Sequence, residues 1–175
     1  DPQWRNLRNF YNKEKIEAHY RYLTKLLNYL SNIYNKNVVV CIHPNEDLEK
    51  KRKYFPGFKV VKYQTRENIM KAFIVLFFET GAIVDAILLK KRIATLFSKI
   101  LDENHIIHAE DYMKKVGIIK INIEDETAFD KDDFLFKLDK AKENYSDFIE
   151  SNIAPDGNNI GYEKIIKTLK ERFFL

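Results

Sequence analysis

A histidine and a proline follow an uninterrupted apolar run. Residues 38–42 are apolar throughout, and His43, Pro44, Asn45 and Glu46 come directly after them. An apolar run without polar alternation is typical of a strand that is covered on both faces of a parallel sheet. Because Pro44 restricts the backbone, we expect the His43 imidazole at the end of this strand, where it can meet a ligand. The alternative is a structural histidine that caps the strand.

Small and hydroxyl-bearing residues follow a second apolar run. Residues 73–78 are all apolar, and Glu79, Thr80, Gly81 and Ala82 lead from them into a predicted helix. The first N–H groups of a helix are unpaired and its dipole favours an anion, so this helix start is predicted to bind phosphate. The alternative is ordinary capping of the helix by the Thr80 hydroxyl.

An aspartate interrupts the apolar helix that begins there. Asp85 lies about one helical turn after Gly81, among residues that are otherwise apolar. A carboxylate in such a segment needs a partner, and a ribose hydroxyl at the edge of the sheet would supply one. The alternative partner is a basic side chain, and we considered Lys62, Lys90 and Arg92.

Other polar groups predict less. His105 and His108 lie near Glu110 and Asp111, but their spacing fits no specific metal site, so we expect none. Residues 49–53 are charged and are expected to form a solvated helix face. The glycine-rich dinucleotide motif, the P-loop, the Gly-x-Ser-x-Gly motif and the Cys-x-x-Cys motif are all missing. Their absence argues against a classical dehydrogenase, a P-loop NTPase, a serine hydrolase and a thioredoxin.

Helices and strands alternate in the segments that must position these residues. The apolar spacing predicts helices at residues 12–34, 45–54, 65–72, 82–89, 108–116, 130–152 and 159–174. Strands are predicted at residues 38–42, 58–63, 73–78, 92–97 and 118–123. This order predicts a Rossmann-like α/β fold, a parallel sheet with helices on both faces, with its ligand beyond the carboxyl ends of the strands.

Composition limits the class of protein. The chain has 175 residues, 45% of them hydrophobic, which is enough for a single domain with a real core. Its 30 basic and 26 acidic residues are interleaved, so the charge does not indicate a nucleic-acid partner. The single cysteine, Cys41, cannot form an internal disulfide and fits the cytoplasm. No signal peptide or membrane span is expected. Because the chain begins with Asp1 and its first helix has no strand before it, we expect a piece of a longer, two-domain protein.

These motifs together resemble a known family. Residues 38–44, 77–86 and 91–96 are similar to the C-terminal half of GT-B glycosyltransferases, including bacterial surface-polysaccharide glycosyltransferases, sialyl- and polysialyltransferases and CDP-glycerol glycerophosphotransferases. In those families a His-Pro pair after a strand and small or hydroxyl residues at a helix start bind the phosphate of a nucleotide-activated donor. The similar positions here are His43-Pro44 and Thr80-Gly81.

The resemblance implies a domain of the GT-B C-terminal type that binds a CMP-, CDP- or UDP-sugar and supports its metal-independent transfer. In this hypothesis His43 is catalytic and stabilises charge on the leaving phosphate. The donor phosphate contacts His43, Pro44, Glu79, Thr80, Gly81 and Ala82. Asp85 holds the ribose, and Tyr63, Gln64 and Thr65 frame the base.

The resemblance also sets expectations about partners. We expect no cofactor beyond the nucleotide-sugar, no nucleic acid, and a glycan or lipid-linked acceptor bound by an N-terminal domain. The full protein would be cytoplasmic, with peripheral association at the inner face of the membrane as one option. Two alternatives stay open. One is a nucleotide-sugar 2-epimerase-like or glycerophosphotransferase domain, because Thr80-Gly81-Ala82 is comparable to the epimerases' small residues. The other is a non-catalytic α/β interaction domain in which His43 and Thr80 are only caps.

Overall fold

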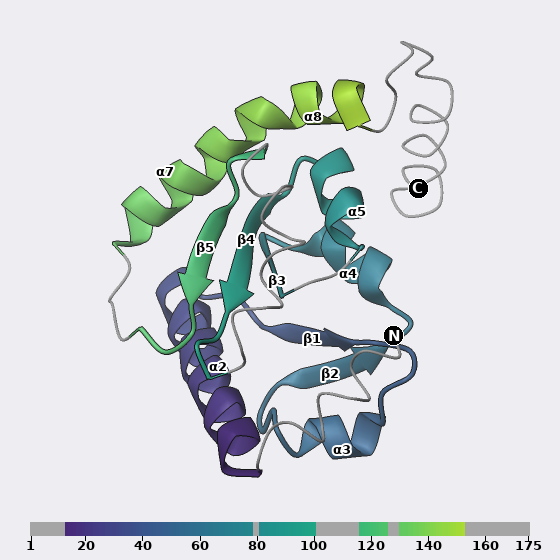
Figure 1. The fold of residues 1–175 in the computed structure, drawn as a ribbon, viewed down its shortest axis with the longest axis vertical. Coiled ribbons are helices and arrows are strands. Elements are labelled where there is room, and N and C mark those ends of the chain that lie inside the picture. The colour runs from purple at the N-terminus through teal and green to yellow at the C-terminus, as the bar shows by residue number, and fades with distance from the viewer. Residues whose placement is uncertain (1–12, 79–80, 101–115, 126–129, 153–175) are drawn as a thin grey trace.

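The computed structural model describes residues 13–78, 81–100, 116–125 and 130–152 of the chain. Helices and parallel strands alternate in them, which confirms the predicted α/β class (Figure 1). The helices are α2 (Lys13–Tyr34), α3 (Leu48–Arg52), α4 (Thr65–Lys71), α5 (Ile83–Leu88), α7 (Lys131–Ala141) and α8 (Tyr145–Asn152), with the 3₁₀ turn η2 (Lys142–Asn144) between the last two. The strands are β1 (Val39–Ile42), β2 (Lys59–Lys62), β3 (Ile74–Phe77), β4 (Arg92–Phe97) and β5 (Ile119–Asn122).

Some predicted segments lie outside the described residues. They are the helix at 159–174 and all but the last residue of the helix at 108–116. The four candidate metal ligands His105, His108, Glu110 and Asp111 lie outside them as well. Within the described part of the chain, no helix is both long and apolar enough to cross a bilayer.

The strands form two small parallel sheets instead of the expected single one. β1 pairs with β2, and β3, β4 and β5 pair in that order, but no ladder joins β1 to β3. Figure 1 shows the strands of the two sheets running in different directions. β1 and β3 are each only four residues long, so a ladder between them would contribute few hydrogen bonds. Both sheets pack against α2.

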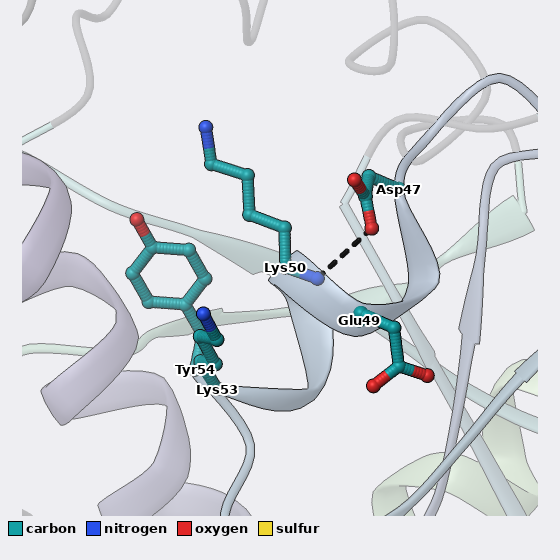
Figure 2. A pocket seen from close by; sticks show the side chains of 5 residues that line it. All are labelled: Asp47, Glu49, Lys50, Lys53 and Tyr54. Carbon is teal, nitrogen blue, oxygen red and sulfur yellow. Dashed lines mark hydrogen bonds between the residues drawn. The ribbon is translucent and has the colours of Figure 1, made fainter.

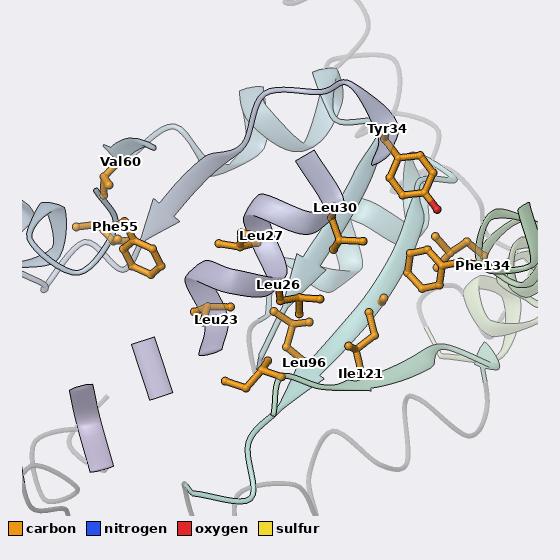
Figure 3. Packing of buried hydrophobic residues seen from close by; sticks show 14 residues of the cluster. Leu23, Leu26, Leu27, Leu30, Tyr34, Phe55, Val60, Leu96, Ile121 and Phe134 are labelled. Carbon is orange, nitrogen blue, oxygen red and sulfur yellow. The ribbon is translucent and has the colours of Figure 1, made fainter. Parts of the chain in front are cut away.

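The longest helix supplies the centre of the main core. Leucines recur along one face of α2 at helical spacing, as the sequence predicts for an amphipathic helix. The buried members on α2 are Leu23, Leu26, Leu27, Leu30 and Tyr34. Figure 3 shows them packed with residues of both sheets, among them Val60 of β2 and Leu96 of β4. One helix thus holds the two sheets on a common core.

The segment predicted as one helix at residues 130–152 is α7, η2 and α8 in succession. Asp130 caps α7, because its side chain accepts hydrogen bonds from the backbone N–H groups of Asp132 and Asp133. The fully buried Tyr145 anchors α8 by donating its hydroxyl to the Lys91 carbonyl at 3.1 Å. Burial raises the pKa of the Tyr145 hydroxyl above its ordinary value.

Candidate functional site

His43 lies in a tight turn at the carboxyl end of β1. The side chain is exposed, and its Nδ1 accepts a hydrogen bond from the Asn45 backbone N–H at 3.1 Å. The turn is closed by the Glu46 N–H, which donates to the His43 carbonyl at 2.9 Å. A neutral imidazole whose Nδ1 accepts must carry its proton on Nε2. His43 therefore shapes the turn, as the structural alternative predicts, and keeps an N–H that can donate to an anion.

Tyr63 follows β2 and reaches the same turn. Its hydroxyl donates to the Pro44 carbonyl at 3.5 Å, and its side chain is 72% exposed. Its backbone has a φ of 62°, a left-handed conformation that is uncommon for a bulky residue and is often found at functional sites. The Lys62 ammonium lies 5.6 Å from the centre of its ring. The structure thus places Tyr63 beside His43-Pro44.

The next two residues have different environments. Gln64 is exposed and occupies the N-cap of α4 without a side-chain cap bond. Thr65 is half-buried and its side chain hydrogen-bonds with the Cys41 thiol of β1. Burial raises the pKa of that thiol, and the Thr65 hydrogen bond opposes the rise. Gln64 is therefore available to a ligand, whereas Thr65 already ties α4 to β1.

The start of α5 is the second predicted part of the site. Glu79 and Thr80 lie outside the described residues. Gly81 is exposed, Ala82 is the N-cap, and the helix begins at Ile83 without a side-chain cap bond. The helix is only six residues long, so its dipole is small. Phosphate binding at this helix start stays a prediction.

Asp85 has a partner that the sequence did not suggest. The Arg66 Nε donates to Asp85 Oδ2 at 2.9 Å, so neither Lys62 nor Lys90 nor Arg92 takes that place. The Asp85 side chain is 19% exposed and that of Arg66 is 60% exposed. The pair forms because α4 and α5 lie next to each other, a tertiary contact that residue spacing alone does not reveal. The binding of a ribose by Asp85 stays a prediction.

Two buried polar groups were missed in the sequence. The Nδ1 of His19 and the Oε2 of Glu67 are buried, and neither has a hydrogen-bond partner among the residues that the structure describes. The His19 side chain packs against the rings of Tyr20 and Phe78, and burial lowers its pKa to about 4. Its place on the apolar face of α2, four residues before Leu23, is the signal that would have found it.

A shallow pocket of about 490 Å³ lies on α3, and Figure 2 shows its lining residues. They are Asp47, Glu49, Lys50, Lys53 and Tyr54. Asp47 caps the helix by accepting from the Lys50 N–H at 3.0 Å, so the helix predicted at residues 45–54 begins only at Leu48. The pocket coincides with the charged face predicted at residues 49–53, and neither His43 nor Tyr63 lines it.

His43 and Tyr63 supply the polar and aromatic groups of the candidate site. Within the described ranges, no three His, Cys, Asp or Glu side chains gather as metal ligands would. An imidazole and an exposed aromatic ring lie together at the ends of β1 and β2, and such groups can contact a phosphate and a base. No family model, curated protein or solved structure matches this chain.

Proposed function

We propose that this chain binds the nucleoside phosphate part of a nucleotide-sugar, as the donor half of a GT-B type glycosyltransferase that makes bacterial surface polysaccharide. The observation that carries the proposal is the contact between the Tyr63 hydroxyl and the Pro44 carbonyl. It places an exposed aromatic ring beside His43 at the carboxyl ends of two adjoining parallel strands. Ligands of open α/β folds bind at that end of the strands.

The two side chains suit the two halves of a nucleoside phosphate. An exposed tyrosine ring offers a surface on which a base can stack, a contact worth about 1–3 kcal/mol per base. The Nε2 proton of His43 can donate to a phosphate oxygen, and a hydrogen bond to a charged acceptor is stronger than a neutral one. The exposed Gln64 amide next to Tyr63 can donate to or accept from the edge of the base.

The proposed reaction is displacement at the sugar carbon that carries the nucleotide. An acceptor hydroxyl forms the new glycosidic bond, the bond from that carbon to the phosphate oxygen breaks, and the electron pair leaves with the nucleoside phosphate. Negative charge grows on the phosphate as the bond breaks, so a donor held in place by the turn stabilises the transition state more than the bound substrate. His43 supplies that donor. The acceptor and the base that takes its proton belong to a second domain.

A second candidate is a non-catalytic interaction domain. The hydrogen bond from the Asn45 N–H to His43 Nδ1 favours it, because a histidine that only shapes a turn would make the same contact. In that case His43 and Tyr63 bind no nucleotide, and their loss affects only local stability.

Calorimetric titration of the full chain with CMP, CDP and UDP separates the two candidates. We expect one of the nucleotides to bind, with affinity lowered about 5- to 100-fold in Tyr63→Leu, because the stacking surface is lost. His43→Ala should weaken the same nucleotide about tenfold. Phe136→Leu is the matched control, since Phe136 is 65% exposed on α7 and should leave binding unchanged. Absence of binding at millimolar nucleotide by the folded chain would favour the interaction domain.

A further inference from the structure

We propose that Arg66 binds the donor phosphate and that Asp85 positions Arg66 instead of holding the ribose; this inference rests on the proposed function. The structure pairs the Asp85 carboxylate with Arg66, which is neither the expected ribose hydroxyl nor one of the basic side chains considered from the sequence. A carboxylate engaged with a guanidinium needs no ribose hydroxyl to offset its partial burial. Asp85 thus positions the Arg66 guanidinium, which can contact a ligand of opposite charge.

The arginine lies between the two predicted parts of the site. Arg66 is in the first turn of α4, three residues after Tyr63, and its Nε donates to Asp85 of α5 at 2.9 Å. Asp85 in turn comes one helical turn after Gly81. The guanidinium thus links the end of β2, where the base is proposed to stack, to the helix that follows β3. A diphosphate that extends from the base toward that helix would pass it.

The two side chains of the ion pair differ in exposure, as is expected when a largely buried carboxylate positions an exposed ligand-binding cation. Asp85 is 19% exposed and Arg66 is 60% exposed, so the anion is largely withdrawn from solvent whereas much of the cation faces it. A guanidinium has five N–H donors, and the contact with Asp85 uses only that of Nε. The two Nη groups can donate a parallel pair of hydrogen bonds to phosphate oxygens, which a lysine cannot reproduce.

The alternative is an ion pair that only joins two helices. Exposed pairs of that kind contribute little to stability, with a typical range of about 0–1 kcal/mol. The two roles predict different binding data, because a phosphate-binding arginine distinguishes a nucleotide from its nucleoside and a helix-joining pair does not.

The test measures the affinity of CMP, CDP and UDP and of cytidine and uridine for the wild-type chain and four variants. Arg66→Gln should weaken the nucleotide that binds by at least about tenfold and leave its nucleoside unchanged. The nucleotide affinity of Arg66→Lys should lie between those of the wild type and Arg66→Gln, since lysine keeps the charge but loses the paired donors. Asp85→Asn should weaken the nucleotide by a few-fold and leave the nucleoside unchanged. Arg52→Gln is the matched control, because Arg52 is an exposed arginine paired with Glu49 on α3, and it should change neither affinity.

Several results would overturn the inference. Equal nucleotide affinity in Arg66→Gln and the wild type would show that Arg66 makes no phosphate contact. A loss of nucleoside affinity in Asp85→Asn would indicate that Asp85 contacts the ribose, as expected from the sequence. If Tyr63→Leu and His43→Ala weaken the nucleotide while Arg66→Gln does not, the proposed function stands and only the role of Arg66 fails. If the wild type binds no nucleotide, both fail together. Thermal unfolding of each variant confirms that it is folded.

Discussion

Tyr63 adopts a backbone conformation that costs free energy for a residue with a side chain. Its φ is 62°, in the left-handed region that glycine enters without penalty. Its ring is 72% exposed, so burial offsets little of that cost. Strain retained at an exposed position is explained if the ring is needed for a ligand.

If the ring is kept for a ligand, its removal should lower nucleotide affinity without lowering the free energy of unfolding. Tyr63→Gly should keep or raise the free energy of unfolding by up to about 1 kcal/mol and abolish stacking of the base. Tyr63→Ala is the control, because it removes the ring but keeps the strained backbone, and it should bind as poorly without the gain in stability. Urea unfolding measures the first effect and calorimetry the second. A loss of more than about 1 kcal/mol in Tyr63→Gly would show that the ring is structural.

His19 predicts a specific dependence of stability on pH. Burial lowers its pKa from 6.5 to about 4, with Glu124 opposing and Lys51 adding to the shift. Between these values the unfolded chain binds a proton that the folded chain does not. Protonation of His19 in the unfolded chain therefore costs no stability above about pH 6.5. As the pH falls from there toward 4, it lowers the free energy of unfolding by about 3 kcal/mol in total.

Urea unfolding at pH 7, 6 and 5 tests this dependence. His19→Leu removes the titrating group, so its free energy of unfolding should fall less steeply over that range than that of the wild type. Phe136→Leu is a suitable control, since Phe136 is 65% exposed and carries no titrating group, so it should leave the slope as it is. Parallel slopes in His19→Leu and the wild type would contradict a buried, neutral His19.

At the scale of the elements, one ion-pair cluster joins β4 to the helix that covers it. Arg92 donates from Nε and Nη2 to the two carboxylate oxygens of Asp139 at 2.9 and 2.8 Å, and Lys142 donates to the same carboxylate at 2.6 Å. The Arg92 hydrogen bond is the main reason that the pKa of Asp139 lies below its ordinary value. Two cations therefore hold one anion at the contact between α7 and β4.

Removal of that charge should destabilise the chain moderately. The Asp139 side chain is 43% exposed, so solvent screens the pair and we expect Asp139→Asn to lower the free energy of unfolding by about 1 kcal/mol. Because the folded pKa is lowered, the stabilisation is present above the ordinary aspartate value of 3.8 and is lost as the pH falls below it. Asp133→Asn, at an exposed i,i+4 pair on α7, is the control and should cost less. Equal losses in the two variants would contradict the cluster.

Residue spacing predicted the elements better than their contacts. The apolar repeat of α2 and the continuous apolar runs of β1, β3 and β4 are local signals, and these elements formed where they were expected to within a residue or two. The Asp85 partner and the Asp47 cap were missed. The first depends on how α4 and α5 pack. The second depends on where the turn after β1 ends, because the residue that follows that turn, Asp47, accepts the Lys50 N–H.

At the scale of the whole molecule, the division of the sheet is the main departure from expectation. Apolar runs predict strands that are covered on both faces, but they do not say which strands pair. In β1 and β3 the last residue alone is buried and the other three are half-buried, so the expected full cover is missing there. The α2 leucines pack against both sheets (Figure 3). The residues of the candidate site are likewise divided between the two sheets. His43 and Tyr63 follow β1 and β2 of the two-stranded sheet, and Asp85 lies on α5, which follows β3 of the three-stranded sheet. The Arg66–Asp85 ion pair connects α4, the helix that follows β2, to α5.

NMR mapping of nucleotide binding tests the proposed site most directly. Backbone amide shifts of the full chain would be recorded by NMR during titration with CMP, CDP and UDP. We predict that one nucleotide shifts the amides of His43, Asn45 and Glu46 and of Tyr63, Gln64 and Arg66. The amides of Lys50 on α3 and of Lys53 at its C-cap should stay unchanged. Shifts confined to the α3 pocket, or none at millimolar nucleotide, would contradict a nucleoside phosphate site at the ends of β1 and β2.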